Sequence, residues 1–364
     1  MAPQVSIIGA GIAGLVLGQC LRRRSIPATI FEKSKQIPAL QNFGITLQNH
    51  VGQRLVQELD LDETAFINDN AVHSKSDPNG PLRVNRSAFL RTLAKDLDIK
   101  WDHKLTGLSR GTRHKLEFEH DGAKQTYEAE LVFVTDGVHS AARNSLNIKK
   151  DAFHLEVLPF VVYNGKRRFS KEKLPADLEG CLSPNGISHL VNSVLLQITS
   201  GYSTREELAI NYTLSRPAES SDDELLGRSN ADAESLARRF LDEASQLPDL
   251  QEPFKSVFDP VVMKDDRLLH WLMRSALIDS STAEELVHKG VVLLGDAASP
   301  QPILGGYGAN AAIMDAFAIA KATDPSGSVN IAAYRDLHAQ WKTWKADAEQ
   351  AIGDMHRPSA RASI

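Results

Sequence analysis

The sequence predicts an α/β fold with an inserted β-rich segment and a helical return at the end of the chain. Two patterns predict it. Short apolar runs that end at glycine or acidic residues alternate with helical patterns in the first part of the chain and again near its end, as in buried parallel sheets. After Lys150, strand-like runs follow one another without that rhythm, which favours a sheet of different construction. We therefore expect one discontinuous domain over 1–150 and 270–364 and an inserted domain over 151–269.

The first element is a βαβ unit. Residues 4–8 form an apolar run that ends at Gly9. Residues 12–24 have a helical pattern with three arginines in the last turn, where cations complement the helix dipole. Residues 28–31 form the second strand.

The remaining elements follow in chain order. We expect amphipathic helices at 50–59 and 87–97, a hairpin at 115–130 with its turn at His120-Asp121-Gly122, and a buried strand at 131–134. The inserted segment has strand-like runs at 154–163, 188–199 and 208–214 and a polar helix at 231–246. The chain then returns with a buried strand at 290–294, an alanine-rich helix at 309–322 and a long amphipathic helix at 331–355.

The composition is that of an ordinary globular protein. Of the 364 residues, 42% are hydrophobic and 24% are charged, and the formal net charge of −5 comes without any long basic stretch. Nucleic-acid binding needs a concentrated positive face, so we expect none. Cys20 and Cys181 cannot form a disulfide framework, and no run reaches the ~20 apolar residues that span a bilayer. We expect a cytoplasmic protein, monomeric or homodimeric, that binds no membrane.

A glycine motif, residues 9–14 (GAGIAG), lies between the first strand and the first helix. Gly9 allows the tight turn, Gly11 lets the backbone approach a pyrophosphate, and Gly14 permits close strand–helix packing. Glu32 follows Gly14 by 18 residues, where it can accept hydrogen bonds from a ribose 2′-OH and would repel a 2′-phosphate. These residues predict a Rossmann-type site for an NAD-like nucleotide or FAD rather than NADP. The alternative is a chance glycine turn.

Two further motifs follow apolar strands. They are residues 135–143 (TDGVHSAAR) and residues 295–302 (GDAASPQP), and the second leads into residues 305–310 (GGYGAN). The three motifs together resemble those of the FAD-dependent monooxygenases of the para-hydroxybenzoate hydroxylase-like group, the class A flavoprotein hydroxylases. The resemblance covers roughly the first 150 and the last 100 residues, with the motifs in the same order and spacing.

Physical roles can be assigned to the third motif. Asp296 would be unpaired at the end of a buried strand unless it accepts hydrogen bonds, which the ribityl hydroxyls of FAD would supply. The alternative is that Asp296 caps the next helical turn. The helix that follows would present the free N–H groups of Gly308, Ala309 and Asn310 to the pyrimidine edge of the flavin, which is anionic when reduced.

The resemblance implies further cofactor contacts. Asp136 is expected to contact FAD and to shape the path of NAD(P)H, and Arg143, at the end of the same motif, matches the family's arginine, although it would serve equally as a surface salt-bridge partner. Arg86 matches an arginine that approaches the flavin or its phosphates, with Arg83 close enough in sequence to be confused with it. Gly44 matches a small-residue turn near the cofactor, and Lys33 completes the expected contacts.

Nothing in the inserted segment identifies a substrate. Tyr163, Arg167 and Tyr212 are the candidates for catalysis, because tyrosine or arginine can bind or deprotonate a phenol. Arg168 and His189 have the same polar character, and each of the five is also explained as an ordinary sheet residue. Three histidines lack metal-ligand spacing, so we expect no metal: His50, His139 and His338.

The chain departs from the family pattern around the expected flavin ring. Ser299 stands where the family usually has His, Ile303 where it has Pro, Tyr307 where it has a polar residue such as Gln, and Phe43 where a small residue is common. Larger or less rigid residues there would restrict the movement of the flavin toward NAD(P)H.

The leading hypothesis is a monooxygenase that uses FAD, NAD(P)H and O₂ to hydroxylate or epoxidise a small aromatic or natural-product-like substrate. One alternative keeps FAD in an oxidoreductase or in a cyclisation or rearrangement enzyme without net oxygen insertion. The other is an NAD-binding sensor without turnover.

Overall fold

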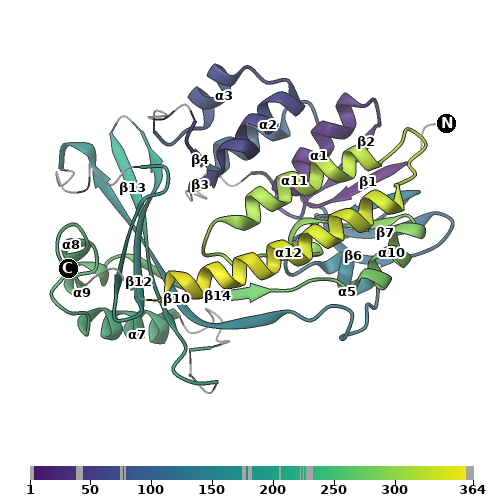
Figure 1. Ribbon diagram of the computed structural model, residues 1–364. Helices are drawn as coiled ribbons and strands as arrows, with labels where there is room; N and C mark the ends of the chain where they lie inside the picture. The colour runs from purple at the N-terminus through teal and green to yellow at the C-terminus, as the bar shows by residue number, and fades with distance from the viewer. Residues whose placement is uncertain are drawn as a thin grey trace.

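Two five-stranded sheets divide the molecule, as Figure 1 shows. The computed structural model describes residues 4–37, 44–73, 77, 79–173, 178, 183–204, 206–221, 223, 225–226 and 233–357. Phe43 and Cys181 lie outside these residues. One sheet is parallel and the other antiparallel, and they stand at opposite ends of the view in Figure 1. The fold is therefore α/β with a Rossmann-type parallel sheet and a separate antiparallel sheet.

The parallel sheet has the strand order β15-β9-β1-β2-β5. Its members are β1 (Val5–Ile8), β2 (Ala28–Phe31), β5 (Asp98–Lys100), β9 (Leu131–Val134) and β15 (Val291–Leu293). Every neighbouring pair is parallel. Because β1, β9 and β15 are buried along their whole length, they are almost entirely apolar.

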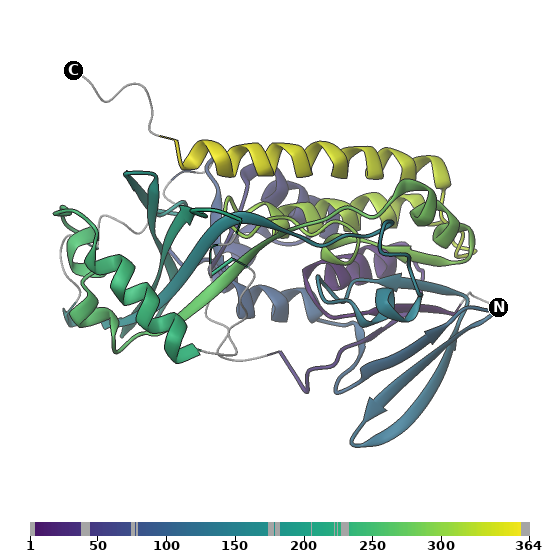
Figure 2. The ribbon, with the colours of Figure 1, turned by 90° about the horizontal axis from the view of Figure 1, so that it is seen from below.

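Helices cover this sheet. They are α1 (Ile12–Arg23), α2 (Asn49–Leu59), α3 (Glu63–Asn70), α4 (Arg86–Ala94), α5 (Ala141–Ser145), α10 (Ser280–His288), α11 (Tyr307–Ala322) and α12 (Ile331–Met355). Helix α11 packs along α1, and α12 extends from the parallel sheet to the antiparallel sheet (Figures 1 and 2). The short η3 (Gly295–Ala297) follows β15.

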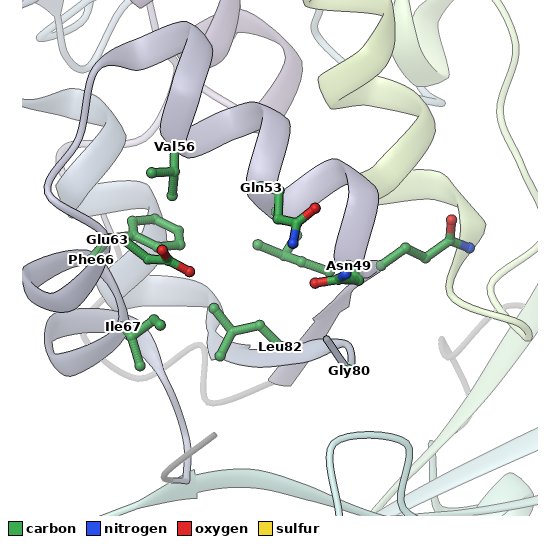
Figure 3. A pocket seen from close by; sticks show the side chains of 11 residues that line it. Asn49, Gln53, Val56, Glu63, Phe66, Ile67, Gly80 and Leu82 are labelled. Atoms are coloured by element: carbon green, nitrogen blue, oxygen red, sulfur yellow. The ribbon is translucent and has the colours of Figure 1, made fainter. Parts of the chain in front are cut away.

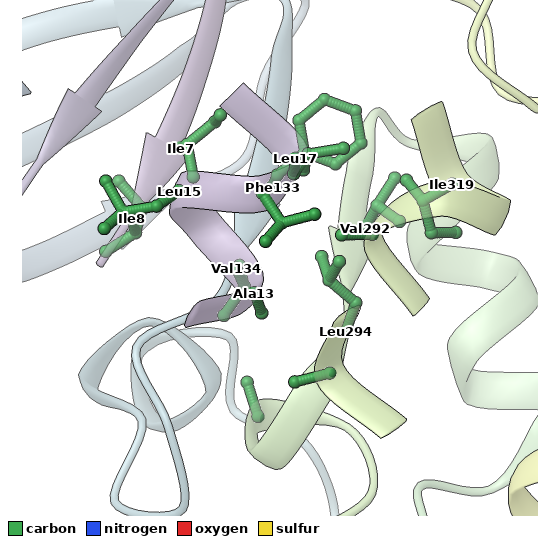
Figure 4. Close-up of a cluster of buried hydrophobic side chains, with 14 of the residues drawn as sticks. Ile7, Ile8, Ala13, Leu15, Leu17, Phe133, Val134, Val292, Leu294 and Ile319 are labelled. Atoms are coloured by element: carbon green, nitrogen blue, oxygen red, sulfur yellow. The ribbon is translucent and has the colours of Figure 1, made fainter. Parts of the chain in front are cut away.

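The core of this part of the molecule lies between the sheet and its helices (Figure 4). Ile7 of β1, Leu15 of α1, Phe133 of β9 and Val292 of β15 all have no solvent exposure. Segments separated by more than 250 residues therefore share one apolar core. This is expected because the chain rejoins the parallel sheet at β15 after the antiparallel sheet.

Two small sheets complete this domain. A two-stranded antiparallel sheet of β3 (Gly44–Leu47) and β4 (Leu82–Asn85) is one of them. The other is a three-stranded sheet that contains β6 (Lys104–Ser109), β7 (His114–His120) and β8 (Ala123–Ala129). The turn from β7 to β8 has positive φ at both Asp121 and Gly122, which suits a tight hairpin.

The antiparallel sheet has the order β11-β12-β13-β10-β14. Its strands are β10 (Glu156–Ser170), β11 (Ile187–Val191), β12 (Val194–Ser203), β13 (Glu207–Pro217) and β14 (Arg267–Ser275), with η1 (Lys171–Lys173) after β10. Helices α7 (Ala233–Ser245), α8 (Phe254–Val257) and α9 (Pro260–Met263) pack on one face and enclose a second apolar core.

Most of the expected elements are present, with several differences. The run at 188–199 is split into β11 and β12 by a turn at Asn192 and Ser193, both with positive φ. The helix expected at 87–97 ends at Ala94 and is followed by β5. Helix α3 and the two-stranded sheet of β3 and β4 were not expected. Strand β14 crosses the domain boundary expected at residue 270, because the whole strand pairs with β10.

No helix among the described residues is long and apolar enough to cross a membrane.

Candidate functional site

The three motifs meet at one edge of the parallel sheet. Gly9 follows β1, Asp136 follows β9 and Asp296 follows β15, and these three strands are neighbours. In an open α/β sheet, ligands bind outside the carboxyl ends of the strands. This edge is therefore the candidate site.

Close backbone packing shapes the first motif. Gly9 has φ +104°, and its carbonyl accepts a hydrogen bond from Thr135 Oγ1 at 2.9 Å. A Cβ on Gly14 would lie 2.0 Å from the Gly9 carbonyl oxygen. Only glycine at position 14 lets α1 begin this close to the loop after β1. The hydrogen bond from Thr135 to Gly9 connects the first motif to the second.

The N-terminus of α1 offers hydrogen-bond donors. Gly11 is the N-cap residue, it provides no side-chain cap, and no acidic residue lies in the first turn. The position of a Cβ on Gly11 would have only the Thr135 carbonyl oxygen near it, at 4.0 Å. A helix start with uncapped N–H groups and open space in front suits the binding of a pyrophosphate.

Glu32 lies against the same loop. Its Oε2 accepts a hydrogen bond from Ala10 N at 2.8 Å and its Oε1 accepts one from Ser34 N at 2.9 Å. Burial lowers the pKa of the Arg86 guanidinium, and the nearby Glu32 charge opposes that effect. Arg86 therefore lies on the Glu32 side of the site, and Lys33 is exposed.

Asp136 is only partly satisfied by the described residues. Its Oδ2 accepts a hydrogen bond from Ala142 N at 3.0 Å, while Oδ1 is buried and has no hydrogen-bond partner among them. Burial raises the pKa of this carboxyl. A buried oxygen without a donor indicates that a ligand or water hydroxyl completes the site.

Arg143 is not a surface salt-bridge residue. Its side chain is buried and donates to the Ala297 carbonyl at 2.9 Å and to the Val138 carbonyl at 2.7 Å. The guanidinium carbon lies 3.8 Å from the centre of the Phe153 ring. Arg143 thus connects the second motif to the third.

Asp296 is accessible but surrounded by protein. The residue is exposed to solvent, yet the protein around it raises the pKa of its carboxyl to about 6 by desolvation. Its Oδ1 lies 4.0 Å from the position of a Cβ on Gly308, at the start of α11. A carboxylate that is both exposed and partly desolvated is available to a ligand.

Helix α11 begins beside Asp296. Gly306 is its N-cap residue, with φ +70° and no side-chain cap, so the N–H groups from Gly306 to Ala309 lack helical acceptors. The side chain of Asn310 has a separate role. Its amide donates to the Thr46 and Gly306 carbonyls and accepts from Gln48 N, so the side chain joins the start of α11 to β3.

Gly44 has a packing role that the sequence did not indicate. A Cβ there would lie 2.3 Å from Arg83 Nε and 2.5 Å from the Ser200 carbonyl oxygen. Arg83 passes through this space and donates to Ser200 O at 3.0 Å and Thr46 Oγ1 at 2.9 Å. Its partner in β12 is 117 residues away, so no local signal could have separated its role from that of Arg86.

The three catalytic candidates lie on the helix-covered face of the antiparallel sheet. Tyr163 donates to Glu243 of α7 at 3.1 Å. Tyr212 donates to Asp266 at 2.7 Å, and Arg167 forms an ion pair with the same carboxylate at 2.7 Å. All three side chains are buried beneath α7–α9, which separates them from the cofactor edge.

The opposite face of that sheet carries polar residues that sequence reasoning missed. Asn164, Asn211 and Thr213 are buried there. Asn164 donates to Thr213 Oγ1 at 3.1 Å, whereas both amide atoms of Asn211 are buried without a hydrogen-bond partner among the described residues. On the same face, Val162 and Met273 contact Leu304, which precedes α11. This face, which α7–α9 do not cover and which we call the open face, therefore adjoins the loop before α11.

Two other features lie away from this edge. A small pocket between α2, α3 and β4 is lined mainly by apolar side chains, with Glu63 and Gln53 at its rim (Figure 3). Asp102, His120 and Asp121 bring three possible metal-ligand atoms within 4.8 Å of one another at the surface.

The residues that differ from the family pattern divide into two kinds. Ser299 is buried and accepts a hydrogen bond from Gln301 Nε2 at 3.1 Å. Ile303 is 47% exposed and Tyr307 is half-buried, so both remain available to a ligand.

Comparisons with known proteins agree with this geometry. Residues 7–39 match the family model described as "NAD(P)-binding Rossmann-like domain". The chain is 26% identical to the FAD-dependent monooxygenase vrtH of Penicillium aethiopicum, with 87% of this chain and 83% of that protein covered. It is 27% identical to the FAD-dependent monooxygenase aptC of Emericella nidulans, with 99% and 92% covered.

Solved structures show the same fold. The 2,6-dihydroxypyridine-3-hydroxylase of Arthrobacter nicotinovorans superposes with a TM-score of 0.72 at 17% identity, covering 98% of this chain and 92% of that chain. HpxO of Klebsiella pneumoniae, solved with FAD and uric acid, gives a TM-score of 0.65 at 17% identity, covering 98% and 90%. The chain is thus similar over most of its length to curated FAD-dependent monooxygenases, and it shares the fold of these solved structures.

Proposed function

We propose that the protein binds FAD along the carboxyl edge of its parallel sheet and uses NAD(P)H and O₂ to insert one oxygen atom into a small organic substrate. The substrate lies between the flavin and the open face of the antiparallel sheet. The observation that carries the proposal is the convergence of three separated motifs on one edge, each with groups left available to a ligand.

The residues of this edge suit FAD from end to end. Glu32, fixed by Ala10 N and Ser34 N, retains oxygen lone pairs for the adenosine ribose. The uncapped start of α1 suits the pyrophosphate. Asp296 is placed to accept hydrogen bonds from the ribityl chain, and the uncapped start of α11 suits the pyrimidine edge.

Bound FAD would supply the redox chemistry: two electrons from NAD(P)H would reduce O₂, so that one oxygen atom enters the substrate and the other is released as water. The protein binds and orients the reactants. N–H groups at the start of α11 stabilise negative charge on the flavin ring. The sheet wall and the loop around Leu304 exclude water from the reacting groups.

Asn211 is the residue we assign to substrate recognition. An amide offers donors and an acceptor, and a buried amide without partners is costly unless a ligand completes it. The wall beside it is mixed, with polar Asn164 and Thr213 and apolar Val162 and Met273. This combination fits a mainly apolar ring system that carries hydroxyl or carbonyl groups.

The test uses purified protein. It should carry a flavin absorption spectrum, or acquire one when FAD is added. NAD(P)H consumption should rise in the presence of a true substrate from a panel of hydroxylated aromatic and natural-product-like compounds, and the product should be one oxygen atom heavier. Protein that binds no FAD would contradict the cofactor assignment.

The product mass also tests the second candidate, a flavoenzyme without oxygen insertion. The exposed Ile303 in the loop before α11 favours it, because the family's proline would hold that loop more rigidly. A product of unchanged mass, or one lighter by two hydrogens, would support this candidate over oxygen insertion.

A further inference from the structure

One buried carboxylate, Asp315 of α11, has no place in the site as described so far. It lies eight residues beyond the first residue of α11 and is 1% exposed. Its neighbours are mostly apolar, so its burial demands that both oxygens be satisfied.

Both oxygens have partners. Oδ2 accepts a hydrogen bond from Gly295 N at 2.9 Å, and Oδ1 accepts one from Trp341 Nε1 of α12 at 2.7 Å. Gly295 is the residue immediately before Asp296. The same carboxylate therefore holds the backbone that presents Asp296 and joins that turn to the long C-terminal helix.

A second contact from α12 supports the same turn. Tyr334 Oη donates to the carbonyl of Leu293, the last residue of β15, at 3.1 Å. Tyr334 and Trp341 pack edge to face, with ring centres 5.7 Å apart. Helix α12 thus supports residues 293–295 at two points, one of them through Asp315.

We propose that Asp315 is a positioning residue for the cofactor site. Its hydrogen bond from Gly295 N fixes the Gly295–Asp296 turn, and its hydrogen bond from Trp341 connects that turn to α12. This inference rests on the proposed binding of FAD at Asp296. Asp315 acts through the backbone of Gly295 and touches no part of the cofactor itself.

The primary variant is Asp315→Asn, which keeps the shape of the side chain. One of its two terminal atoms becomes an NH₂ group, which must face the N–H of either Gly295 or Trp341. Either the Gly295 turn or Trp341 then loses its hydrogen bond to residue 315, and the bond that remains is to a neutral amide oxygen. We expect the dissociation constant of the apoprotein for FAD, measured by quenching of flavin fluorescence, to rise about tenfold.

A double-mutant cycle separates positioning from general destabilisation. If Asp315 acts through Asp296, Asp315→Asn should change FAD affinity less than twofold in an Asp296→Ala background. Asp266→Asn is the matched control, since it disturbs a buried carboxylate beneath α7–α9. It should lower the unfolding temperature of the apoprotein and leave FAD affinity within twofold.

Trp341→Phe provides a second variant if Asp315→Asn fails to fold. It removes the indole N–H together with the pyrrole part of the ring and should weaken FAD binding about threefold. Unchanged affinity in the folded variants, or full additivity with Asp296→Ala, would overturn the proposal. A wild-type protein that binds no FAD would instead overturn the proposed function.

Discussion

The parallel and antiparallel sheets place their polar groups by different rules. In the parallel sheet, the polar groups of the site come just after the strands, so Gly9, Asp136 and Asp296 gather at one edge. In the antiparallel sheet, polar side chains occur along the strands and alternate between two faces. Sequence motifs therefore locate the site at the edge of the parallel sheet. The substrate-facing residues of the antiparallel sheet can be recognised only when it is known which face the helices cover.

The two faces of the antiparallel sheet also differ in how buried polar groups are satisfied. On the covered face, Asp266 is bonded to both Arg167 and Tyr212. On the open face, the Asn211 amide lacks partners among the described residues. The comparison predicts that changes to the covered face affect stability, changes to the open face affect substrate response, and changes at the parallel-sheet edge affect FAD.

The largest expected effect is on the covered face. Asp266→Ala leaves the Arg167 guanidinium buried without its counter-ion and should lower the free energy of unfolding by about 3–5 kcal/mol. Denaturant titration measures this, and FAD affinity of the folded fraction should be unchanged. Asp265→Asn, at the exposed neighbouring position, is the control and should change stability by less than about 0.5 kcal/mol.

Gly14→Ala should affect the cofactor edge. The new Cβ would meet the Gly9 carbonyl, so the backbone must shift, which should cost about 1–3 kcal/mol and weaken FAD binding at least tenfold. Gly18→Ala, one turn later in α1, is the control. Its Cβ meets only the flexible ends of Ile30 and Leu97, so FAD titration should give a near wild-type constant, and equal losses in both variants would contradict the assignment.

The pH dependence of FAD affinity tests Asp296. With its pKa at about 6, the carboxylate is mostly protonated at pH 5, and FAD should bind about tenfold more weakly there than at pH 7.5. Titration across this range measures the effect, and Asp296→Asn should flatten it.

The pH effect can be separated from unfolding. The folded-state pKa values of Asp296 and Asp315 are about 6 and about 7, both above the ordinary carboxyl value, so the folded state binds more protons than the unfolded state between about pH 4 and 7. These two groups therefore favour the folded state as pH falls through that window. Affinity that improves on acidification would contradict the role of Asp296.

The smallest change in stability is expected on the open face. Asn211→Leu removes a buried amide without partners and should leave the free energy of unfolding within about 1 kcal/mol of wild type. It should nevertheless reduce the stimulation of NAD(P)H consumption by substrate. Asn164→Leu is the comparison variant and should be the less stable of the two, because it breaks the bond to Thr213.

These contrasts explain how much could be predicted from sequence. The strands and helices around the three motifs follow from local apolar patterns, and the long helix at 331–355 was predicted with the observed bounds. The strand-like pattern of the inserted segment placed Tyr163 and Tyr212 on strands. It could not show that α7–α9 cover their face, because those helices come later in the chain.

Residues with distant partners were also beyond local reasoning. Arg143 bonds to Ala297, 154 residues away, and Arg83 bonds to Ser200. Asp315 reads as one polar residue in an apolar helix, and its purpose becomes visible only when Gly295 and Trp341 meet it. Composition and motif spacing do not predict such contacts between residues that are far apart in the sequence.

The way the chain enters and leaves the antiparallel sheet has an evolutionary consequence. Strands β10 and β14 lie side by side, and Glu156 pairs with Ser275, so the segment between them starts and finishes at nearly the same point in space. A segment with adjoining ends can be exchanged for another without moving the flanking chain. Related enzymes could thus acquire new substrates by exchanging the segment between β10 and β14, while the edge of the parallel sheet that we assign to FAD stays unchanged.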